Sequence, residues 1–525
     1  AVAGNTVLGE SALDASVTGG DNTAIGKNAL TALTSGQYNV AVGKDALGAN
    51  TTGTENTAVG SGALDANTTA TRNSALGYFS LGANTTGTQN TAIGHGSLAV
   101  NTTANNNTGV GYNTLGSNTT GASNTAIGSL ALDANTTGTQ NTGLGTGALS
   151  ENTTASNNTA VGYLALDQNT TGSSNAAVGS NSLKANTTGF YNSALGHGSL
   201  FGNTTGNNNV AIGYESLVAN TTGANNVAVG ASALDANTTA NGNVAIGKGS
   251  LGTNTTGGDN VAVGTNSLLA NTTASNNTAV GNDALASNTT GHSNVAVGTN
   301  ALDANTTANN NTAIGLQSLT ANTTGAQNSG LGTYTLGTNS TGDNNTAVGY
   351  GALFANTTAD NNTACGKDAL ISNTTGTQNN AIGALALDAC TTGERNQAMG
   401  YNALGALTSG IRNVAIGNDS MVTLTTGSNN VAIGEQTLYY STANGCTAVG
   451  SKSLTSNTTG GENTGCGVST GLNLTTGSQN TCIGSEAGHD LTTGSNNLLL
   501  GKAAGRSGSP SGTVNDESNI VCLGN

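Results

Sequence analysis

The residues best placed to do chemistry in this sequence are asparagines in the motif Asn-Thr-Thr, which recurs every seventeen residues. The motif fills twenty consecutive units from Asn50 to Asn373, with Ser in its second place at Asn339, and returns at Asn457. By pattern, each copy is an acceptor for N-glycosylation. The motif therefore indicates either a sugar-coated surface or a structural role for the asparagine side chain.

The same place in the unit also accepts apolar side chains, which favours the structural role. Other residues replace the asparagine at Leu33, Leu407, Leu424, Leu474, Leu491 and Cys390. Exchange between Asn and Leu in one frame is typical of a side chain that points inward, where stacked amides hydrogen-bond along an axis. We predict an inward amide ladder that includes Asn50, Asn67, Asn84, Asn101 and Asn118. Glycans on a minority of these sites, and O-linked modification of the threonines, are the alternatives.

Catalytic and metal-binding patterns are weak. The histidines His95, His197, His292 and His489 are scattered, with no HExxH motif and no nucleophile partner. Aspartates recur at one place in non-adjacent units, which is typical of solvated turn charges; they are Asp65, Asp133, Asp167, Asp235 and Asp303. The glycine-rich nonapeptides of calcium-binding β-rolls are absent, so calcium at isolated sites is only the alternative. We predict that the chain is not an enzyme and has no cofactor.

Six cysteines occur without a CxxC pair, at Cys365, Cys390, Cys446, Cys466, Cys482 and Cys522. Several of them replace residues at positions expected to point inward, so small buried thiols are expected. Disulfides that join copies across a symmetry axis, as from Cys482, are the alternative. Paired aromatic residues such as Tyr78 and Phe79 fall at variable positions and are expected to face outward.

The composition excludes several broad classes of protein. Among 525 residues, 80 are Gly, one is Pro and only 7% are charged, and the formal net charge is −15. The glycines lack the spacing and the proline content of collagen. The acidic balance argues against nucleic acid and against anionic membranes as partners. No run approaches the ~18 apolar residues of a membrane-spanning helix, so this segment is not expected to insert into a membrane.

A seventeen-residue repeat must position all of these residues. Glycine recurs from Gly9 to Gly434 without a gap and, after one shortened unit, from Gly450 to Gly501, which makes 30 units. With the repeat positions numbered along residues 56–72, position 1 is Asn, position 5 is Gly, position 9 is Leu, and positions 12–15 read Asn-Thr-Thr-Gly or Asn-Thr-Thr-Ala. Position 1 is expected to be a turn residue stacked between coils.

A unit this short cannot bury its own apolar face, so successive units must stack as coils. We predict an all-β fold, a parallel β-roll or β-solenoid of about 30 coils over residues 1–501. At about 4.8 Å per coil the array would be roughly 145 Å long. Residues 502–525 are predicted to be an irregular segment that leads to a missing or cleaved domain.

Each coil is expected to hold two short β segments, at positions 2–4 and 8–9. Side chains alternate along a strand, so positions 2 and 4 share a face and position 3 lies opposite. We predict that position 4 fills the interior together with Leu at position 9. Position 3 is small in nearly every unit, which close approach of another backbone would explain. It is predicted to be an oligomer face, formed by Ala58, Ala75, Ala92, Gly109 and Ala126. A lone solenoid with an Ala-rich face is the alternative.

The Asn-x-Ala-Ile/Val-Gly core of the unit, as in residues 209–213, 243–247 and 413–417, resembles the head repeats of trimeric autotransporter adhesins of the YadA and haemagglutinin type. The resemblance implies a left-handed parallel β-roll in a homotrimer. The longer unit, with Asn-Thr-Thr-Gly and Ala-Leu, is also similar to the repeat shafts of phage and bacterial tail-fibre proteins. Seventeen residues exceed the usual adhesin repeat by a few, so an additional turn or a third short strand is expected.

The sequence therefore predicts a homotrimeric, extracellular fibre or adhesin shaft that mediates attachment to a host-cell surface or a surface glycan. A virion tail fibre is one alternative. The other is a solenoid whose regular threonines form a face that binds a lattice or a glycan.

Overall fold

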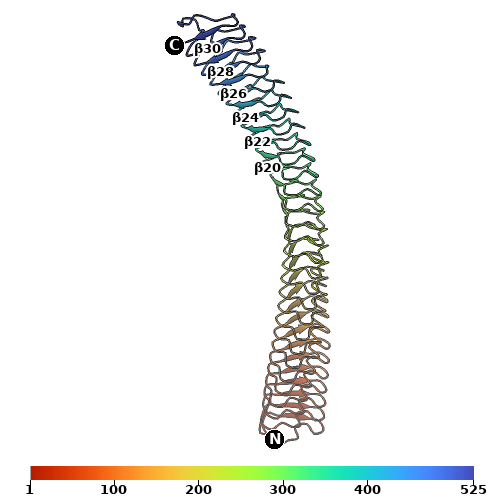
Figure 1. Cartoon of the computed structure of the whole chain (residues 1–525). Coiled ribbons are helices and arrows are strands. Elements are labelled where there is room, and N and C mark those ends of the chain that lie inside the picture. Colours follow the sequence, from red (N-terminus) through yellow and green to blue (C-terminus); the bar gives the residue numbers. More distant parts are fainter. Residues whose placement is uncertain (1, 525) are drawn as a thin grey trace. The chain divides into compact units, whose positions relative to one another are not determined.

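One three-residue strand per coil, at repeat positions 2–4, is the regular element of this fold. The computed structural model describes residues 2–524, in which 31 parallel strands build a β-solenoid (Figure 1). The predicted all-β fold class and the seventeen-residue coil are confirmed. These residues form no helix that is long and apolar enough to cross a membrane.

The strand bounds follow the repeat closely. In the first half of the chain the strands are β1 (Thr6–Leu8), β2 (Thr23–Ile25), β3 (Val40–Val42), β4 (Thr57–Val59), β5 (Ser74–Leu76), β6 (Thr91–Ile93), β7 (Thr108–Val110), β8 (Thr125–Ile127), β9 (Thr142–Leu144), β10 (Thr159–Val161), β11 (Ala176–Val178), β12 (Ser193–Leu195), β13 (Val210–Ile212), β14 (Val227–Val229), β15 (Val244–Ile246) and β16 (Val261–Val263). In the second half they are β17 (Thr278–Val280), β18 (Val295–Val297), β19 (Thr312–Ile314), β20 (Ser329–Leu331), β21 (Thr346–Val348), β22 (Thr363–Cys365), β23 (Asn380–Ile382), β24 (Gln397–Met399), β25 (Val414–Ile416), β26 (Val431–Ile433), β27 (Thr447–Val449), β28 (Thr464–Cys466), β29 (Thr481–Ile483), β30 (Leu498–Leu500) and β31 (Val521–Leu523).

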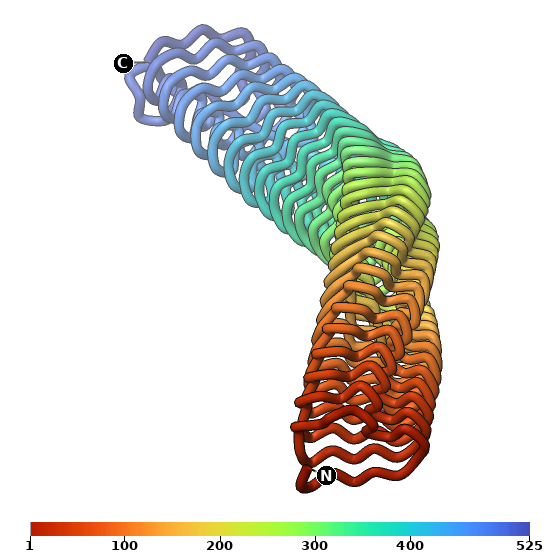
Figure 2. Tube along the Cα trace, turned by 90° about the horizontal axis from the view of Figure 1, so that it is seen from below, coloured from red at the N-terminus to blue at the C-terminus, as the bar shows by residue number. Residues whose placement is uncertain are grey.

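The coils group into two compact units, Ala1–Ala262 and Val263–Asn525, each built from the same repeat. Within a unit, strands pair with residues one repeat away, as Ala58 pairs with Ala75. Figure 2 traces the chain as successive loops of similar outline. Across the shortened coil the pairing distance is sixteen residues, so that Val431 pairs with Thr447, and it returns to seventeen in the next pair, Thr447 with Thr464.

Residues 502–524 complete one larger coil. Its strand β31 pairs with β30, with Leu498 opposite Val521. The intervening residues form an enlarged turn, in which the Thr492 amide donates to the Asn515 carbonyl at 2.7 Å.

The predicted second β segment, at positions 8–9, is wrong. These positions lie in a turn, and the Leu at position 9 adopts a left-handed backbone, with φ of 51° at Leu64 and 52° at Leu81. This conformation is costly for Leu. It is held by complete burial of the side chain and by a hydrogen bond to the next coil, where the Leu64 amide donates to the Ser80 carbonyl at 3.0 Å.

The predicted assignment of inner and outer faces is also wrong, because position 3 points into the coil. Ala58, Ala75, Ala92, Gly109 and Ala126 are all buried within a single chain, so they cannot form an oligomer face. The coil is thin, and the Leu side chains of position 9 fill the space opposite. A Cβ added to Gly143, at position 3, would lie 3.5 Å from Cδ1 of Leu132. The small residues therefore make room for leucines of the same chain.

Glycine at position 5 lets neighbouring coils approach. Gly213 has a φ of +137°, and a Cβ added there would lie 2.5 Å from the carbonyl oxygen of Gly230 in the next coil. Both the backbone conformation and the contact with backbone atoms exclude a side chain at this place.

Candidate functional site

The five predicted ladder residues lie inside the coil and form one chain of amide hydrogen bonds. From Asn67 onward, each Nδ2 donates to the Oδ1 of the preceding ladder residue, at 2.9 Å from Asn67 to Asn50, 3.1 Å from Asn84 to Asn67, 2.9 Å from Asn101 to Asn84 and 2.9 Å from Asn118 to Asn101. The same nitrogens also donate to the carbonyl three residues on, as Asn67 does to Ala70 at 3.2 Å.

These hydrogen bonds bear directly on the glycosylation alternative. All five side chains have no solvent-exposed area, and each Nδ2 is already a hydrogen-bond donor. In the folded coil, the Nδ2 atoms to which a glycan would be attached are therefore inaccessible. The sequon pattern is therefore a by-product of the ladder.

A second ladder runs along position 1. The Asn56 Oδ1 accepts the backbone amide of Asn73 at 3.0 Å, and the Asn73 Nδ2 donates to the Gly87 carbonyl at 2.9 Å. The sequence predicts a turn between coils for these residues, but not that their side chains are buried. The signal was their near-invariance along the array, since a solvated turn residue would vary more.

The paired threonines have different roles. At position 13 the hydroxyl bonds the next coil, as Thr51 Oγ1 donates to the Thr68 carbonyl at 3.1 Å. At position 14 the side chain, for example that of Thr52, is exposed. Of the paired threonines in the described coils, the position 14 row is thus the one consistently open to solvent, which narrows the predicted Thr-Thr face to this row.

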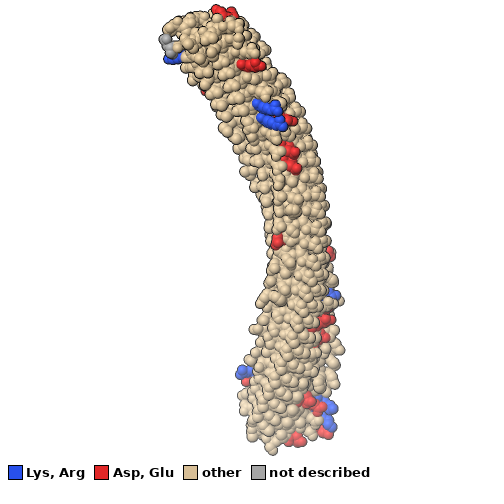
Figure 3. Space-filling model, in the orientation of Figure 1, with Lys and Arg blue, Asp and Glu red and all other residues tan. Residues whose placement is uncertain are grey.

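The outward face of the strands carries an apolar row. Position 4 is Val, Ile, Leu, Met or Cys in every coil, and the side chains are half-buried or exposed, with Leu76 at 50% and Ile212 at 40%. Charged residues do not occur at positions 2–4 of any coil. Figure 3 shows how few charged side chains interrupt the visible surface. We call the side chains at positions 2 and 4 the strand face.

The cysteines divide between the two sides of the coil. Cys365 and Cys466, at position 4, are exposed, which corrects the expectation that this position buries its thiol. Cys390 and Cys482 are buried, and burial raises the pKa of the Cys482 thiol to about 12. A disulfide between copies through Cys482 is excluded by its position inside the coil.

The aromatic residues lie outside, as predicted. Tyr78, His95 and Tyr112, one above the other in consecutive coils, stack with ring centroids 5.2 and 5.5 Å apart. Because the rings cover each other's faces, this stack stabilises the turn and offers little flat surface to a ligand. Within residues 2–524, no three His, Cys, Asp or Glu side chains gather as metal ligands would.

The recurring aspartates are partly buried instead of fully solvated. Burial raises the pKa of Asp65, Asp133, Asp235 and Asp388 above the ordinary value of 3.8. At Asp133, the neighbouring carboxylate of Asp167 adds to the effect, and Oδ1 has no hydrogen-bond partner in the described chain. The ionised form of these groups therefore destabilises the coil.

We expect Asp133→Asn to stabilise its coil at pH 7 but not in acid. A pKa raised on folding contributes stability that is fully present below pH 3.8 and is lost as the pH rises through the folded value. Hydrogen exchange of residues 130–151 should slow in the variant at pH 7 and should match that of the wild type near pH 3. Equal exchange at pH 7 would contradict the burial of this carboxylate.

Asp490 should respond in the opposite direction. Its pKa is lowered by the Ser507 amide, which donates to Oδ2 at 2.7 Å, and then by His489, whose Nδ1 lies 2.7 Å from Oδ1. The resulting stability is present above pH 3.8 and is lost as the pH falls through the folded pKa. We expect Asp490→Asn to speed proteolysis of the 502–524 turn at pH 7, and the difference from wild type to disappear in acid.

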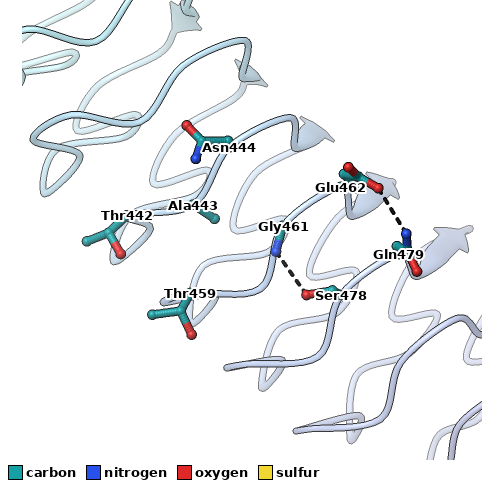
Figure 4. Close-up of a pocket in the computed structure, with 8 residues that line it drawn as sticks. All are labelled: Thr442, Ala443, Asn444, Thr459, Gly461, Glu462, Ser478 and Gln479. Atoms are coloured by element: carbon teal, nitrogen blue, oxygen red, sulfur yellow. Dashed lines mark hydrogen bonds between the residues drawn. The ribbon is translucent and has the colours of Figure 1, made fainter.

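A polar groove lies in the second unit, next to the shortened coil (Figure 4). It has a volume of about 620 Å³ and is lined by residues of three consecutive coils, Thr442, Ala443, Asn444, Thr459, Gly461, Glu462, Ser478 and Gln479. Gln479 Nε2 donates to Glu462 Oε2 at 3.1 Å, and the Gly461 amide donates to Ser478 Oγ at 3.1 Å. The shortened coil is visible in the sequence, whereas the groove beside it is not.

No protein-family model and no curated protein matches the chain. Its function must therefore be inferred from the strand face, the ladders and the groove.

Proposed function

We propose that this chain is the shaft of a homotrimeric extracellular fibre that mediates attachment to a surface, as part of a bacterial adhesin or of a phage tail fibre. The observation that carries the proposal is the strand face, in which position 4 forms an apolar row and no coil has a charged residue at positions 2–4. Soluble monomers rarely expose long apolar patches, and such patches mark interfaces.

Another copy of the chain is the partner that fits this row best. The row repeats once per coil at about 4.8 Å. A partner must offer apolar groups at the same interval over the same length, which a parallel copy in register does. Three copies that turn their strand faces toward a common axis close the assembly and leave no apolar row exposed. The oligomer face thus moves from position 3 to positions 2 and 4.

The mechanical role rests on the hydrogen bonding of the coil. Strands, turns and two amide ladders all bond to neighbouring coils, as at Thr51, Leu64 and Asn67. Bending the array or pulling its coils apart would break several of these bonds at once. A shaft of this kind is stiff and offers a protease few open loops.

Light scattering of the full chain tests the proposal. We expect a mass about three times the 50.7 kDa of one chain. Aspartates on the strand face should repel one another across the symmetry axis and would bury carboxylates without a cationic partner in the interface. The triple variant Ile212→Asp, Val229→Asp, Ile246→Asp is therefore expected to shift the mass strongly toward the monomer.

The matched control places the same three charges on exposed threonines of neighbouring coils. Thr205→Asp, Thr222→Asp, Thr239→Asp alters position 14 and is expected to keep the wild-type mass. A monomeric wild-type chain would refute the proposal. A dimer would refute the three-fold arrangement.

A further inference from the structure

The groove in the second unit exists because one coil lacks an exposed threonine. In regular coils the position 1 amide donates to a carbonyl fourteen residues on, as Asn413 does to Gly427 at 2.8 Å, whereas Asn430 reaches Ala443, thirteen residues on, at 2.9 Å. Thr442 still makes the position 13 bond, from Oγ1 to the Thr458 carbonyl at 2.9 Å. The residue missing between Thr442 and Ala443 is therefore that of position 14. We call the resulting gap in the threonine row the notch.

The notch presents polar groups that are fixed in place but not fully used. Asn444 Oδ1 accepts the Ser428 amide at 2.7 Å, which orients the side chain and leaves Nδ2 without a hydrogen-bond partner among residues 2–524. Glu462 is held through one carboxylate oxygen by Gln479, and its Oε1 has no partner in the described chain. Thr459 is exposed and also lines the groove, on the side of Thr442 and away from Glu462 in the view of Figure 4.

These groups narrow the class of ligand. Glu462 and the net charge of −15 disfavour phosphates, sulfates and nucleic acid. One carboxylate does not make a site for a divalent cation, which needs several oxygen ligands. The lining offers amide, hydroxyl and carboxylate groups and no aromatic or large aliphatic side chain, so an apolar anchor would gain little.

A neutral molecule with vicinal hydroxyl groups satisfies every group in the notch. Two adjacent hydroxyls can donate to the Glu462 carboxylate, in hydrogen bonds that the charge strengthens. A ring or hydroxyl oxygen can accept from Asn444 Nδ2, and Thr459 can do either. We propose that the notch binds a short neutral oligosaccharide. The inference rests on the proposed adhesive function for its biological meaning, since it gives the shaft a point of contact with surface glycans.

Refilling the notch is the direct test. Insertion of one Thr between Thr442 and Ala443 restores a seventeen-residue coil of the kind that the chain builds elsewhere, so folding should be preserved. Saturation-transfer NMR with maltotriose, cellotriose and triacetylchitotriose should show binding of at least one sugar to the wild-type chain. We expect the insertion to weaken that binding at least tenfold and Glu462→Gln to weaken it severalfold.

The reverse change supplies the control. Deletion of Thr222, at position 14 of a regular coil, opens a gap in which Gly242 of the next coil takes the place of Glu462, and it should not create sugar binding. The proposal is overturned if no sugar binds, if the insertion variant binds equally well, or if spermidine competes for the site, which would indicate a cation site. Light scattering of the same samples separates the two ideas, because the mass tests the shaft and sugar binding tests the notch.

Discussion

Asn220→Asp is expected to destabilise the coil around it, although the change only replaces the side-chain NH2 group with an oxygen. Asn220 Nδ2 donates to Asn203 Oδ1 at 2.7 Å and to the Gly223 carbonyl at 2.9 Å, and its Oδ1 accepts from Asn237 at 2.9 Å. A carboxylate would bring a buried negative charge against two acceptor oxygens. Breaking a buried polar network in this way costs about 3–5 kcal/mol. Hydrogen exchange over residues 203–237 should speed up by at least a hundredfold.

Two further variants give this result its meaning. Asn225→Asp, five residues away at exposed position 17, should be neutral, since Asp259 occupies the same repeat position in a later coil with a similar φ. Asn220→Leu should fall between them, at about 1–3 kcal/mol for the unpaired acceptor that it leaves. Lowering the pH should partly rescue Asn220→Asp, because a protonated carboxyl regains a donor. Equal behaviour of the Asn220→Asp and Asn225→Asp variants would disprove the buried ladder.

The ladder and the fold could be predicted from the sequence because the copies of the repeat can be compared with one another. Thirty versions of one coil reveal which places exchange Asn with Leu, as at Leu33 and Leu407, and such exchange indicates the interior. The period also required stacking, because seventeen residues cannot enclose a core alone.

The faces of the strand could not be assigned with the same rule. Alternation places positions 3 and 4 on opposite sides but does not say which side is inside. The usual preference for larger apolar residues inside gave the wrong answer, because Leu at position 9 already fills this thin interior. The sequence nevertheless contains a sign that position 3 lies inside. Glycine occurs at this position in three coils where position 8 is Thr, and in the structure these glycines, Gly109, Gly330 and Gly465, each face both a Ser and a Thr of position 8.

The turns were the least predictable part of the coil. Left-handed residues at positions 7 and 17 are often Asn, Asp or Gly, which signal that conformation, whereas position 9 is Leu. Local preference argues against a left-handed Leu. The leucine side chain is fully buried, so the free energy gained by packing it exceeds the cost of its left-handed backbone. The periodicity of the sequence does not reveal this balance between packing and backbone conformation.

Gly213→Ala should destabilise the contact between two neighbouring coils, although it adds only a methyl group. The φ of +137° is unfavourable for Ala, and the new Cβ would lie 2.5 Å from the Gly230 carbonyl oxygen, a backbone atom that accepts the Ala233 amide in the turn of its own coil. The Gly213 amide also donates to the Leu195 carbonyl at 2.8 Å, so a shift of the glycine strains a second coil. We expect a cost of about 3 kcal/mol. It should appear as faster hydrogen exchange and proteolysis across residues 196–230.

Gly206→Ala separates the effect of backbone conformation from that of space. Its Cβ would lie 2.4 Å from the Gly223 carbonyl oxygen, as close as in the first variant, but its φ lies outside the left-handed region. Alanine already occupies this repeat position at Ala240, two coils along, where it is buried. The coil therefore yields enough for a methyl group at position 15, and we expect a change of less than about 1 kcal/mol. If both variants cost the same, close approach alone would explain the glycines of position 5. If only Gly213→Ala is costly, the backbone conformation is what requires glycine there.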